Sequence, residues 1–250
     1  MSTPIPELDG APLFLVDDLP DTPELVVAGQ EGRHAVEVLR LQPGERVHVG
    51  DGRGAVAEGE VVSAGADGLR VAVRARFEVP APDPEFVLVQ ALPKGDRGPL
   101  AVDLATELGV DRIVPWQASR CVTRWRDDRV DKGVAKWRSA ARAAAKQSRR
   151  PRLPEVTDPM TTREVCGLLG DADLAVVLHE QARRPLTGLT LPGSGTVVVV
   201  VGPEGGLADG EVVAFRAAGA EPVRLGPEVL RTSTAGAAAL AALSVQARWS

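Results

Sequence analysis

The stretch that decides the fold is Thr196 to Thr234, TVVVVVGPEGGLADGEVVAFRAAGAEPVRLGPEVLRTST. It contains two short apolar runs, and each run ends in a turn that contains glycine and proline. The first run, Val197 to Val201, has no polar alternation, which indicates a strand buried on both faces of a parallel sheet. The glycines of the next turn, Gly202 to Gly206, allow the backbone to approach a ligand closely. Two such strand-and-turn units side by side predict a ligand crevice at the carboxyl ends of parallel strands.

The motifs of common nucleotide-binding sites are absent from this crevice. Glycine is common wherever a strand turns into a helix, so the turns could also be ordinary connections. GPEGG lacks the spacing of a dinucleotide-binding loop, and no acidic residue ends a strand about 20 positions later. No Gly-Lys-Ser/Thr follows, which excludes a P-loop. The sequence therefore predicts a ligand other than a common nucleotide cofactor.

The composition is that of a globular protein without a membrane segment. The chain has 250 residues, 44% hydrophobic and 25% charged, enough for one large domain or two small ones. Its longest apolar run is far shorter than a membrane span, and the N-terminus lacks a secretory signal, so we expect a cytoplasmic protein. The two cysteines, Cys121 and Cys166, have no CxxC or histidine partner nearby, so we expect neither a disulfide framework nor a metal site.

Charge is distributed unevenly along the chain. The net charge is −5, yet the segment from Arg120 to Arg152 contains twelve Lys and Arg against three Asp, which is typical of a site for a polyanion. Within it we predict a helix over about 129–148, with an apolar face of Trp137, Ala141, Ala144 and Ser148. Four cations lie on its opposite face without an interleaved acid: Arg138, Arg142, Lys146 and Arg149. Such a face can simply be solvated, but the mutual repulsion of its charges favours phosphate binding.

Two domains of different class are expected. Residues 1–79 contain short strands around one helix, about 31–40, which predicts a small β-barrel with Ala35, Val38 and Leu39 as the apolar positions of that helix. Prolines at alternate positions then mark a linker over 80–85. Residues 86–250 alternate strands with helices, which predicts an α/β domain with a parallel sheet. In its first helix the apolar positions expected are Leu100, Leu104 and Leu108.

Taken together, these segments resemble the bacterial 16S rRNA (uracil-N3)-methyltransferases of the SPOUT superfamily, nearly end to end. The most specific pair is VGPEGGL at Val201–Leu207 and LGPEVLRTSTA at Leu225–Ala235. Further matching segments are LPKGDR (92–97), ATELGVDRIVP (105–115), AAKQSRR (144–150), LHE (178–180), HAVEVLRLQPGERV (34–47) and DGRG (51–54). Two positions differ from the pattern of many relatives, which have Arg at Glu228 and Glu at Ser233.

The resemblance implies a PUA-like RNA-binding barrel, an α/β domain with a deep trefoil knot, and a homodimer. It also implies that S-adenosyl-L-methionine methylates N3 of uridine 1498 in the 16S rRNA of the 30S subunit. Knots are nearly absent from folds in general, so periodicity alone could not predict this one. Two other functions stay open: a ribose 2′-O-methyltransferase of the same superfamily, and a non-catalytic RNA binder in ribosome assembly.

The resemblance also assigns residues to the site. The positions that match the family's cofactor loops are Leu178, His179, Glu180, Gly202, Pro203, Glu204, Gly205, Gly206, Leu225, Gly226, Leu230, Arg231 and Thr232. For catalysis it points to Arg231, Glu204 and Thr232, with the general base unassigned. Arg231 either stabilises negative charge on the uracil, or contacts a phosphate, or holds the knot through a carboxylate such as Glu204. Free amides near a helix N-terminus would satisfy Glu204 in a structural role. The RNA-contact candidates are Arg33, His34, Arg40, Arg138, Arg142, Lys146, Arg149 and Arg150.

Overall fold

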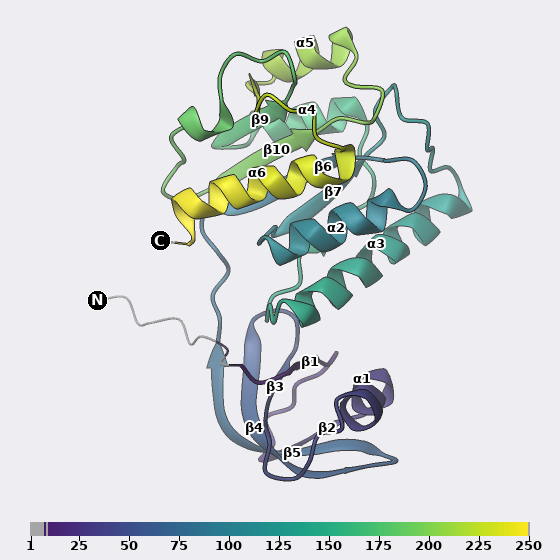
Figure 1. Cartoon of the computed structure of the whole chain (residues 1–250), viewed down its shortest axis with the longest axis vertical. Coiled ribbons are helices and arrows are strands. Elements are labelled where there is room, and N and C mark those ends of the chain that lie inside the picture. The colour runs from purple at the N-terminus through teal and green to yellow at the C-terminus, as the bar shows by residue number, and fades with distance from the viewer. Residues whose placement is uncertain (1–7, 9, 250) are drawn as a thin grey trace. The chain divides into compact units, whose positions relative to one another are not determined.

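The computed structural model describes residue 8 and residues 10–249, which form two compact units (Figure 1). Unit 1 comprises Met1–Ala81 with Ala145–Leu153, and unit 2 comprises Pro82–Ala144 with Pro154–Ser250. The outermost positions of the two predicted domains, residues 1–7, 9 and 250, lie outside the described residues. Within the described part of the chain, no helix is both long and apolar enough to cross a membrane.

Unit 1 contains a five-stranded sheet in the order β1-β3-β4-β5-β2. Its strands are β1 (Leu13–Leu15), β2 (Glu24–Val27), β3 (Arg46–Gly50), β4 (Ala55–Gly65) and β5 (Gly68–Glu78). The pair β1 and β3 is parallel, and the other pairs are antiparallel. Strand β2 begins directly after Pro23, and its alternate residues Leu25 and Val27 are buried, as in a sheet with one covered face.

The helix predicted over 31–40 is two shorter elements. The first is α1 (Gly29–Arg33), and the second is the π-helical turn η1 (His34–Val38), in which Leu39 N donates to the His34 carbonyl at 3.0 Å. The predicted apolar face is correct for Ala35, which is buried, and wrong for Val38 and Leu39, which are exposed. The wider π turn rotates the following residues away from the sheet.

The segment Ala145–Leu153 joins unit 1 through contacts that the sequence did not reveal. Leu153 N donates to the Gly52 carbonyl at 2.9 Å, and Arg152 Nη2 donates to Glu78 Oε1 at 2.7 Å. The C-terminal end of the basic segment therefore helps to build the first unit.

Unit 2 contains a six-stranded sheet in the order β11-β9-β10-β6-β7-β8, with every neighbouring pair parallel. Its strands are β6 (Glu85–Ala91), β7 (Arg112–Trp116), β8 (Glu155–Val156), β9 (Leu174–Leu178), β10 (Thr196–Val201) and β11 (Glu221–Val223). The five valines of β10 are all buried, as the run predicted. The predicted α/β class is thus confirmed.

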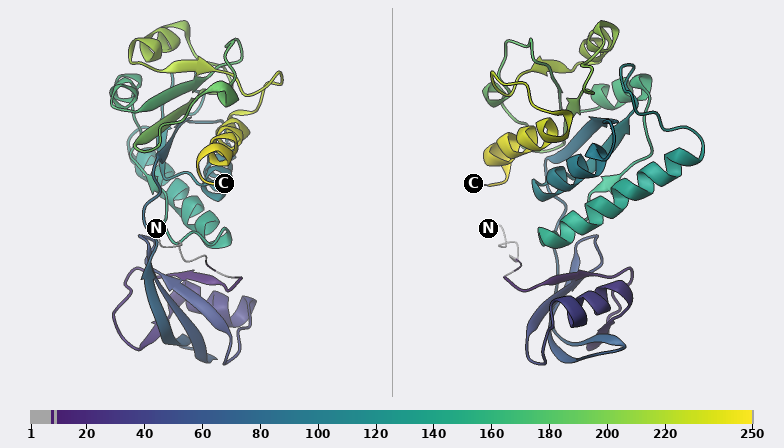
Figure 2. Two further views of the ribbon diagram at one scale, coloured as in Figure 1. Left: turned by 90° about the vertical axis from the view of Figure 1, so that its left-hand side faces the viewer. Right: turned by 45° about the vertical axis from the view of Figure 1, so that its right-hand side comes forward.

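Helices cover both faces of this sheet. The helices α2 (Arg97–Glu107) and α6 (Thr232–Ala247) lie side by side on one face, and α4 (Thr162–Gly170) and α5 (Asp209–Ala217) lie on the other (Figure 2). The long helix α3 (Asp128–Gln147) buries Trp137 among the core residues, as predicted.

The leucine stripe predicted for α2 is not its core face. Leu100 is 46% exposed and Leu104 is half-buried, whereas Ala101, Val102 and Ala105 are fully buried. Leu108, the C-cap residue of α2, is half-buried and packs against the core, so the predicted stripe holds only at its C-terminal end.

Candidate functional site

The loops that follow β9, β10 and β11 meet at the same edge of the sheet. The two glycine-turn strands, β10 and β11, are not neighbours, because β9 lies between them. His179, which directly follows β9, donates its backbone N–H to the Val223 carbonyl at the end of β11, at 2.9 Å. Three loops, each at the carboxyl end of a parallel strand, therefore lie where the crevice was predicted.

The GPEGG turn combines tight packing with exposed backbone. A Cβ at Gly202 would lie 3.0 Å from Leu207 Cδ2, and Gly206 has a φ of +70°, so a side chain is disfavoured at both positions. The turn closes through Gly206 N, which donates to the Pro203 carbonyl at 2.9 Å. Glu204, Gly205 and Gly206 are exposed, so their backbone groups can reach a ligand.

Two side chains that the sequence analysis did not select hold this turn. Arg120 Nη1 donates to the carbonyls of Gly205 and Leu207, at 3.3 and 3.0 Å. The buried Glu211 accepts from Ser119 N at 2.7 Å and from Ala208 N at 2.9 Å. The loop after β7 is thereby fixed to the turn after β10. Arg120 had been counted only as part of the basic segment, and nothing near Glu211 in the sequence indicated its role.

The Glu204 carboxylate contacts the loop after β6. Its Oε1 accepts from Lys94 N at 3.1 Å and lies 3.8 Å from Arg97 Nη1. The alternative in which Arg231 pairs with Glu204 is therefore wrong. A backbone amide does satisfy Glu204, but the amide comes from the LPKGDR segment, which the sequence analysis quoted without assigning it a role.

The third loop ends in Arg231, the N-cap residue of α6. Its backbone carbonyl accepts from Thr234 N and Ala235 N, each at 2.9 Å. The side chain is exposed, and none of the residues that the structure describes hydrogen-bonds or ion-pairs with its guanidinium. Thr232 and Ser233 are buried in the first turn of α6, so a small residue at position 233 suits its surroundings.

The first loop contributes a partly buried imidazole. His179 Nδ1 accepts from Gln181 N at 3.1 Å, which leaves Nε2 as the donor of the neutral ring. Glu180 is exposed next to it. No group of three or more His, Cys, Asp and Glu residues is placed to hold a metal ion in the described ranges, residue 8 and 10–249.

The predicted RNA-contact residues of α3 are not equally available. Lys146 Nζ contacts Glu31 Oε1 at 2.8 Å, with 18% and 17% of the two side chains exposed, so Lys146 is part of an internal ion pair of unit 1. Arg138 donates from Nε to the Val156 carbonyl at 3.1 Å, and its side chain is still 58% exposed. The uniform cationic face predicted for this helix is therefore interrupted at Lys146.

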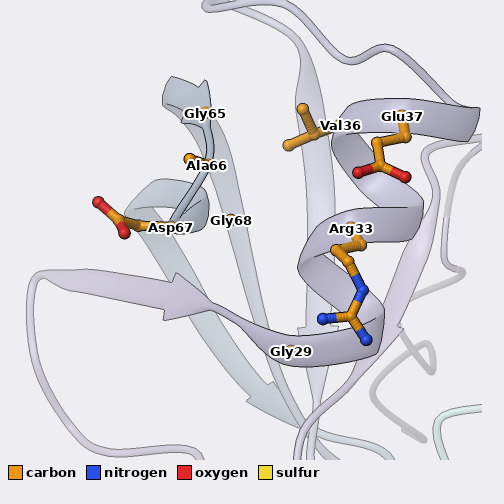
Figure 3. Close-up of a pocket in the computed structure, with 8 residues that line it drawn as sticks. All are labelled: Gly29, Arg33, Val36, Glu37, Gly65, Ala66, Asp67 and Gly68. Atoms are coloured by element: carbon orange, nitrogen blue, oxygen red, sulfur yellow. The ribbon is translucent and has the colours of Figure 1, made fainter.

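In unit 1, Arg33 lies at a hollow of about 270 Å³ between η1 and the β4–β5 turn. Figure 3 shows Arg33 and Glu37 on the helical side of this hollow and Asp67 on the turn opposite. Two carboxylates therefore share the hollow with one guanidinium. The other candidates of this unit, His34 and Arg40, are half-buried and exposed respectively.

Both cysteines are free thiols. Burial raises the pKa of the Cys121 thiol and, for the same reason, that of Cys166. A raised pKa leaves little thiolate at neutral pH, so neither residue has the character of a nucleophile.

Comparison with known proteins agrees with this geometry. A family model described as an RNA methyltransferase domain matches residues 80–244, and one described as an RNA methyltransferase PUA domain matches residues 27–74. The chain belongs to this RNA methyltransferase family. It is 48% identical over 245 residues to the ribosomal RNA small subunit methyltransferase E of Mycobacterium bovis, covering 96% of this chain and 94% of the relative. The enzyme of the same name from Bacillus subtilis is 30% identical, with 90% and 91% covered.

Solved structures place the RNA methyltransferase fold over both units. The ribosomal RNA small subunit methyltransferase E of Neisseria gonorrhoeae, solved bound to S-adenosyl methionine, is 27% identical with a TM-score of 0.82, and 95% of this chain and 98% of that chain are covered. A methyltransferase of Legionella pneumophila, solved with the same cofactor, is 26% identical with a TM-score of 0.79, and 95% and 97% are covered. The PUA unit and the α/β methyltransferase unit are thus both shared with this family.

Proposed function

We propose that this RNA methyltransferase transfers a methyl group from S-adenosyl-L-methionine to N3 of uridine 1498 in the 16S rRNA of the small ribosomal subunit. The observation that carries the proposal is the convergence of three loops, 178–180, 202–206 and 225–232, at the carboxyl edge of one parallel sheet. The near full-length similarity to enzymes named for the small-subunit rRNA supplies the target class.

The residues of the crevice fit the methyl donor. The donor contains an adenine and a ribose, which neutral backbone donors and acceptors can bind, and the exposed backbone of Glu204 to Gly206 offers such groups. Leu225 is half-buried and Leu230 is 40% exposed, so the third loop offers apolar surface for a ring.

The chemistry requires an aligned uracil that loses the proton on N3. When bound, the donor supplies an electrophilic methyl group on a sulfonium. Arg231, with its unpaired guanidinium at the start of α6, stabilises the negative charge that develops on the uracil. Glu204 contributes by fixing the GPEGG turn to Lys94 and Arg97, which is a positioning role. Much of the acceleration comes from alignment, because reacting groups held in place gain a large effective concentration.

RNA binding is assigned to cations of both units. The set comprises Arg33, His34 and Arg40 in residues 1–79, and Arg138, Arg142, Arg149 and Arg150 around the end of α3. We leave Lys146 out because its ammonium group forms an ion pair with Glu31. In a base pair N3 is inside the helix, so the enzyme needs a target uridine that is unpaired or turned out of the stack.

Three further properties belong to the proposal. Residues 1–79 act as the RNA-binding domain, 80–85 as a linker and 86–250 as the methyltransferase domain with a trefoil knot. The chain is a homodimer, supported by the exposed apolar residues Leu100 on α2 and Val245 on α6, which lie on helices that pack together. Its location is the cytoplasm, where small ribosomal subunits are found.

The deciding experiment uses labelled S-adenosylmethionine and small-subunit particles from a strain that lacks the modification. We expect label on N3 of one uridine. Label on a ribose oxygen would instead identify a 2′-O-methyltransferase, and donor binding without transfer would identify an RNA binder without catalysis. Arg231→Lys keeps the charge and Arg231→Gln removes it, so a rate that falls only with Gln assigns the role to charge.

The RNA-binding surface is tested by a double variant, Arg138→Glu with Arg142→Glu. We expect weaker particle binding and unchanged donor affinity, with a shallower dependence on salt. The matched control is Lys132→Glu on the same helix, whose 77% exposed side chain pairs with Asp128. Equal loss in the control would show that net charge alone is responsible.

A further inference from the structure

A second cavity lies beside the three loops, over the carboxyl ends of β6 and β7. Its volume is about 190 Å³, below the roughly 300 Å³ at which pockets for drug-sized ligands begin. It is therefore too small for the methyl donor and suits a single planar ring. Its lining residues are Leu92, Pro93, Gly95, Gly98, Pro99, Thr123, Trp125, Gly133, Lys136 and Trp137.

Two tryptophans form the aromatic wall of this cavity. The rings of Trp125 and Trp137 meet edge to face, with centroids 5.3 Å apart. Each ring rests against a glycine: a Cβ at Gly98 would lie 2.6 Å from Trp137 Nε1, and one at Gly133 would lie 2.5 Å from the Trp125 ring. The rings are thus held rigidly, which suits a stacking surface because little entropy is lost when a ligand binds.

The polar groups that the cavity offers are hydrogen-bond donors. Trp137 is 98% buried, and no acceptor for its indole N–H is found among the residues described in the structure. Lys136, at the same cavity, donates from Nζ to Asp96 Oδ1 at 2.6 Å, and its side chain is still 58% exposed. A donor on a buried ring, with a cation at the rim, matches a carbonyl-bearing base that is attached to a phosphate.

The position of the cavity relates it to the methyl-transfer site. Lys94, in the loop that lines the cavity, donates its N–H to Glu204 of the GPEGG turn, and Thr123 Oγ1 donates to the Pro93 carbonyl at 2.8 Å. Neighbouring strands are about 4.8 Å apart, so the ends of β6 and β7 lie about 5 and 10 Å from the end of β10. The cavity is therefore placed for a nucleotide adjacent to the one that is methylated.

We propose that this cavity, between the 92–98 loop and the Trp125–Trp137 pair, binds an unpaired base of the RNA next to the target uridine. The inference rests on the proposed function, since it names how that site selects its substrate. Stacking on the Trp125 ring and a hydrogen bond from Trp137 Nε1 to a base carbonyl would turn the flanking base out and position the target. The site then contributes specificity through a neighbour of the reactive base.

The first test is photocrosslinking with the wild-type chain, so that no variant needs to fold. Short single-stranded RNAs carry 4-thiouridine either at the target position or at the adjacent nucleotide. We expect the adjacent probe to label the peptides that contain Trp125 or Trp137, and the target probe to label other peptides. The proposal is overturned if neither probe labels these two peptides, or if only the target probe does.

The second test measures binding of the same RNA without the probe. Trp125→Leu should lose about tenfold in RNA affinity, within the range for one stacked base, while donor affinity is unchanged. Trp137→Phe should lose less, because the ring stays and only the N–H is removed. Trp249→Leu is the control, since that ring is 56% exposed at the other end of α6. Unchanged RNA affinity of Trp125→Leu, or an equal loss of donor affinity, overturns the proposal.

The two proposals can fail separately. Wild-type protein that does not methylate particles, yet crosslinks through Trp125, would refute the proposed function and leave the base site. Methylation of N3 without that crosslink would support the proposed function and refute the base site.

Discussion

Replacing Glu211 with Ala should destabilise unit 2 and loosen the GPEGG turn. The carboxylate accepts from two backbone amides, Ser119 N at 2.7 Å and Ala208 N at 2.9 Å, and the residue is 6% exposed. Hydrogen bonds to a charged group contribute about 1.5–3 kcal/mol each, so two give about 3–6 kcal/mol. Water can enter the space left by the side chain and accept some of the hydrogen bonds from these two amides. We therefore expect a loss of about 2–4 kcal/mol in the free energy of unfolding.

A graded series sharpens this prediction. Glu211→Gln keeps one acceptor oxygen and turns an NH₂ group toward the other amide, so it should lose about 1–3 kcal/mol, less than Ala. Asp209→Ala is the matched control, because Asp209 is an exposed acid in the same first turn of α5. It should change the free energy by less than about 0.5 kcal/mol.

The assay is equilibrium urea unfolding followed by tryptophan fluorescence. All four tryptophans belong to unit 2, so the signal reports this unit alone and is not mixed with unfolding of unit 1. A loss below about 0.5 kcal/mol for Glu211→Ala would refute the argument. An equal loss for Asp209→Ala would refute it too, because helix charge would then be the cause.

Three further predictions address other contacts. Arg120→Ala removes the guanidinium that donates hydrogen bonds to two carbonyls of the GPEGG turn. The affinity for S-adenosylmethionine should fall about three- to tenfold, measured by calorimetry. Unchanged affinity would show that the turn keeps its shape without Arg120. Lys146→Met leaves the Glu31 carboxylate without its partner and should destabilise unit 1 by about 3–5 kcal/mol, measured by hydrogen exchange of its strands. Adding Glu31→Leu should recover part of the loss. A single variant as stable as the wild type would contradict this prediction. Cys166 should react with iodoacetamide before the buried Cys121. Both should react faster as the pH rises, because burial raises the pKa of each thiol and the thiolate is the reactive form. Mass spectrometry that finds Cys121 labelled first would contradict this order.

Residue patterns with a local cause were predictable from the sequence. The valine run became β10 because an uninterrupted β-branched stretch can be satisfied only inside a sheet. The face of α3 that contains Trp137 is buried because its spacing follows the helical period. The glycines of the GPEGG turn indicated positions where a side chain is disfavoured: Gly202 packs against Leu207, and Gly206 has a positive φ.

Interactions between distant segments were not predictable in the same way. Helix α2 has leucines at regular spacing, yet Leu100 is exposed while Ala101 and Ala105 are buried, because the buried face depends on which elements pack against the helix. Lys146 read as one cation of a stripe, but its partner Glu31 is 115 positions away. No pattern near Lys146 could indicate that pairing.

The sequence by itself determined the α/β class, the burial of the central strand and the glycine turns, since each depends on backbone conformation and hydrophobic period over a few residues. The tertiary structure alone decided that β9 lies between β10 and β11, and that Arg120, Glu211 and Lys94 hold the turn between them. It also brought Trp125 and Trp137 together beside the site. Strand order and side-chain partners depend on contacts between residues far apart in the chain, and local preferences contain no information about which segments will meet.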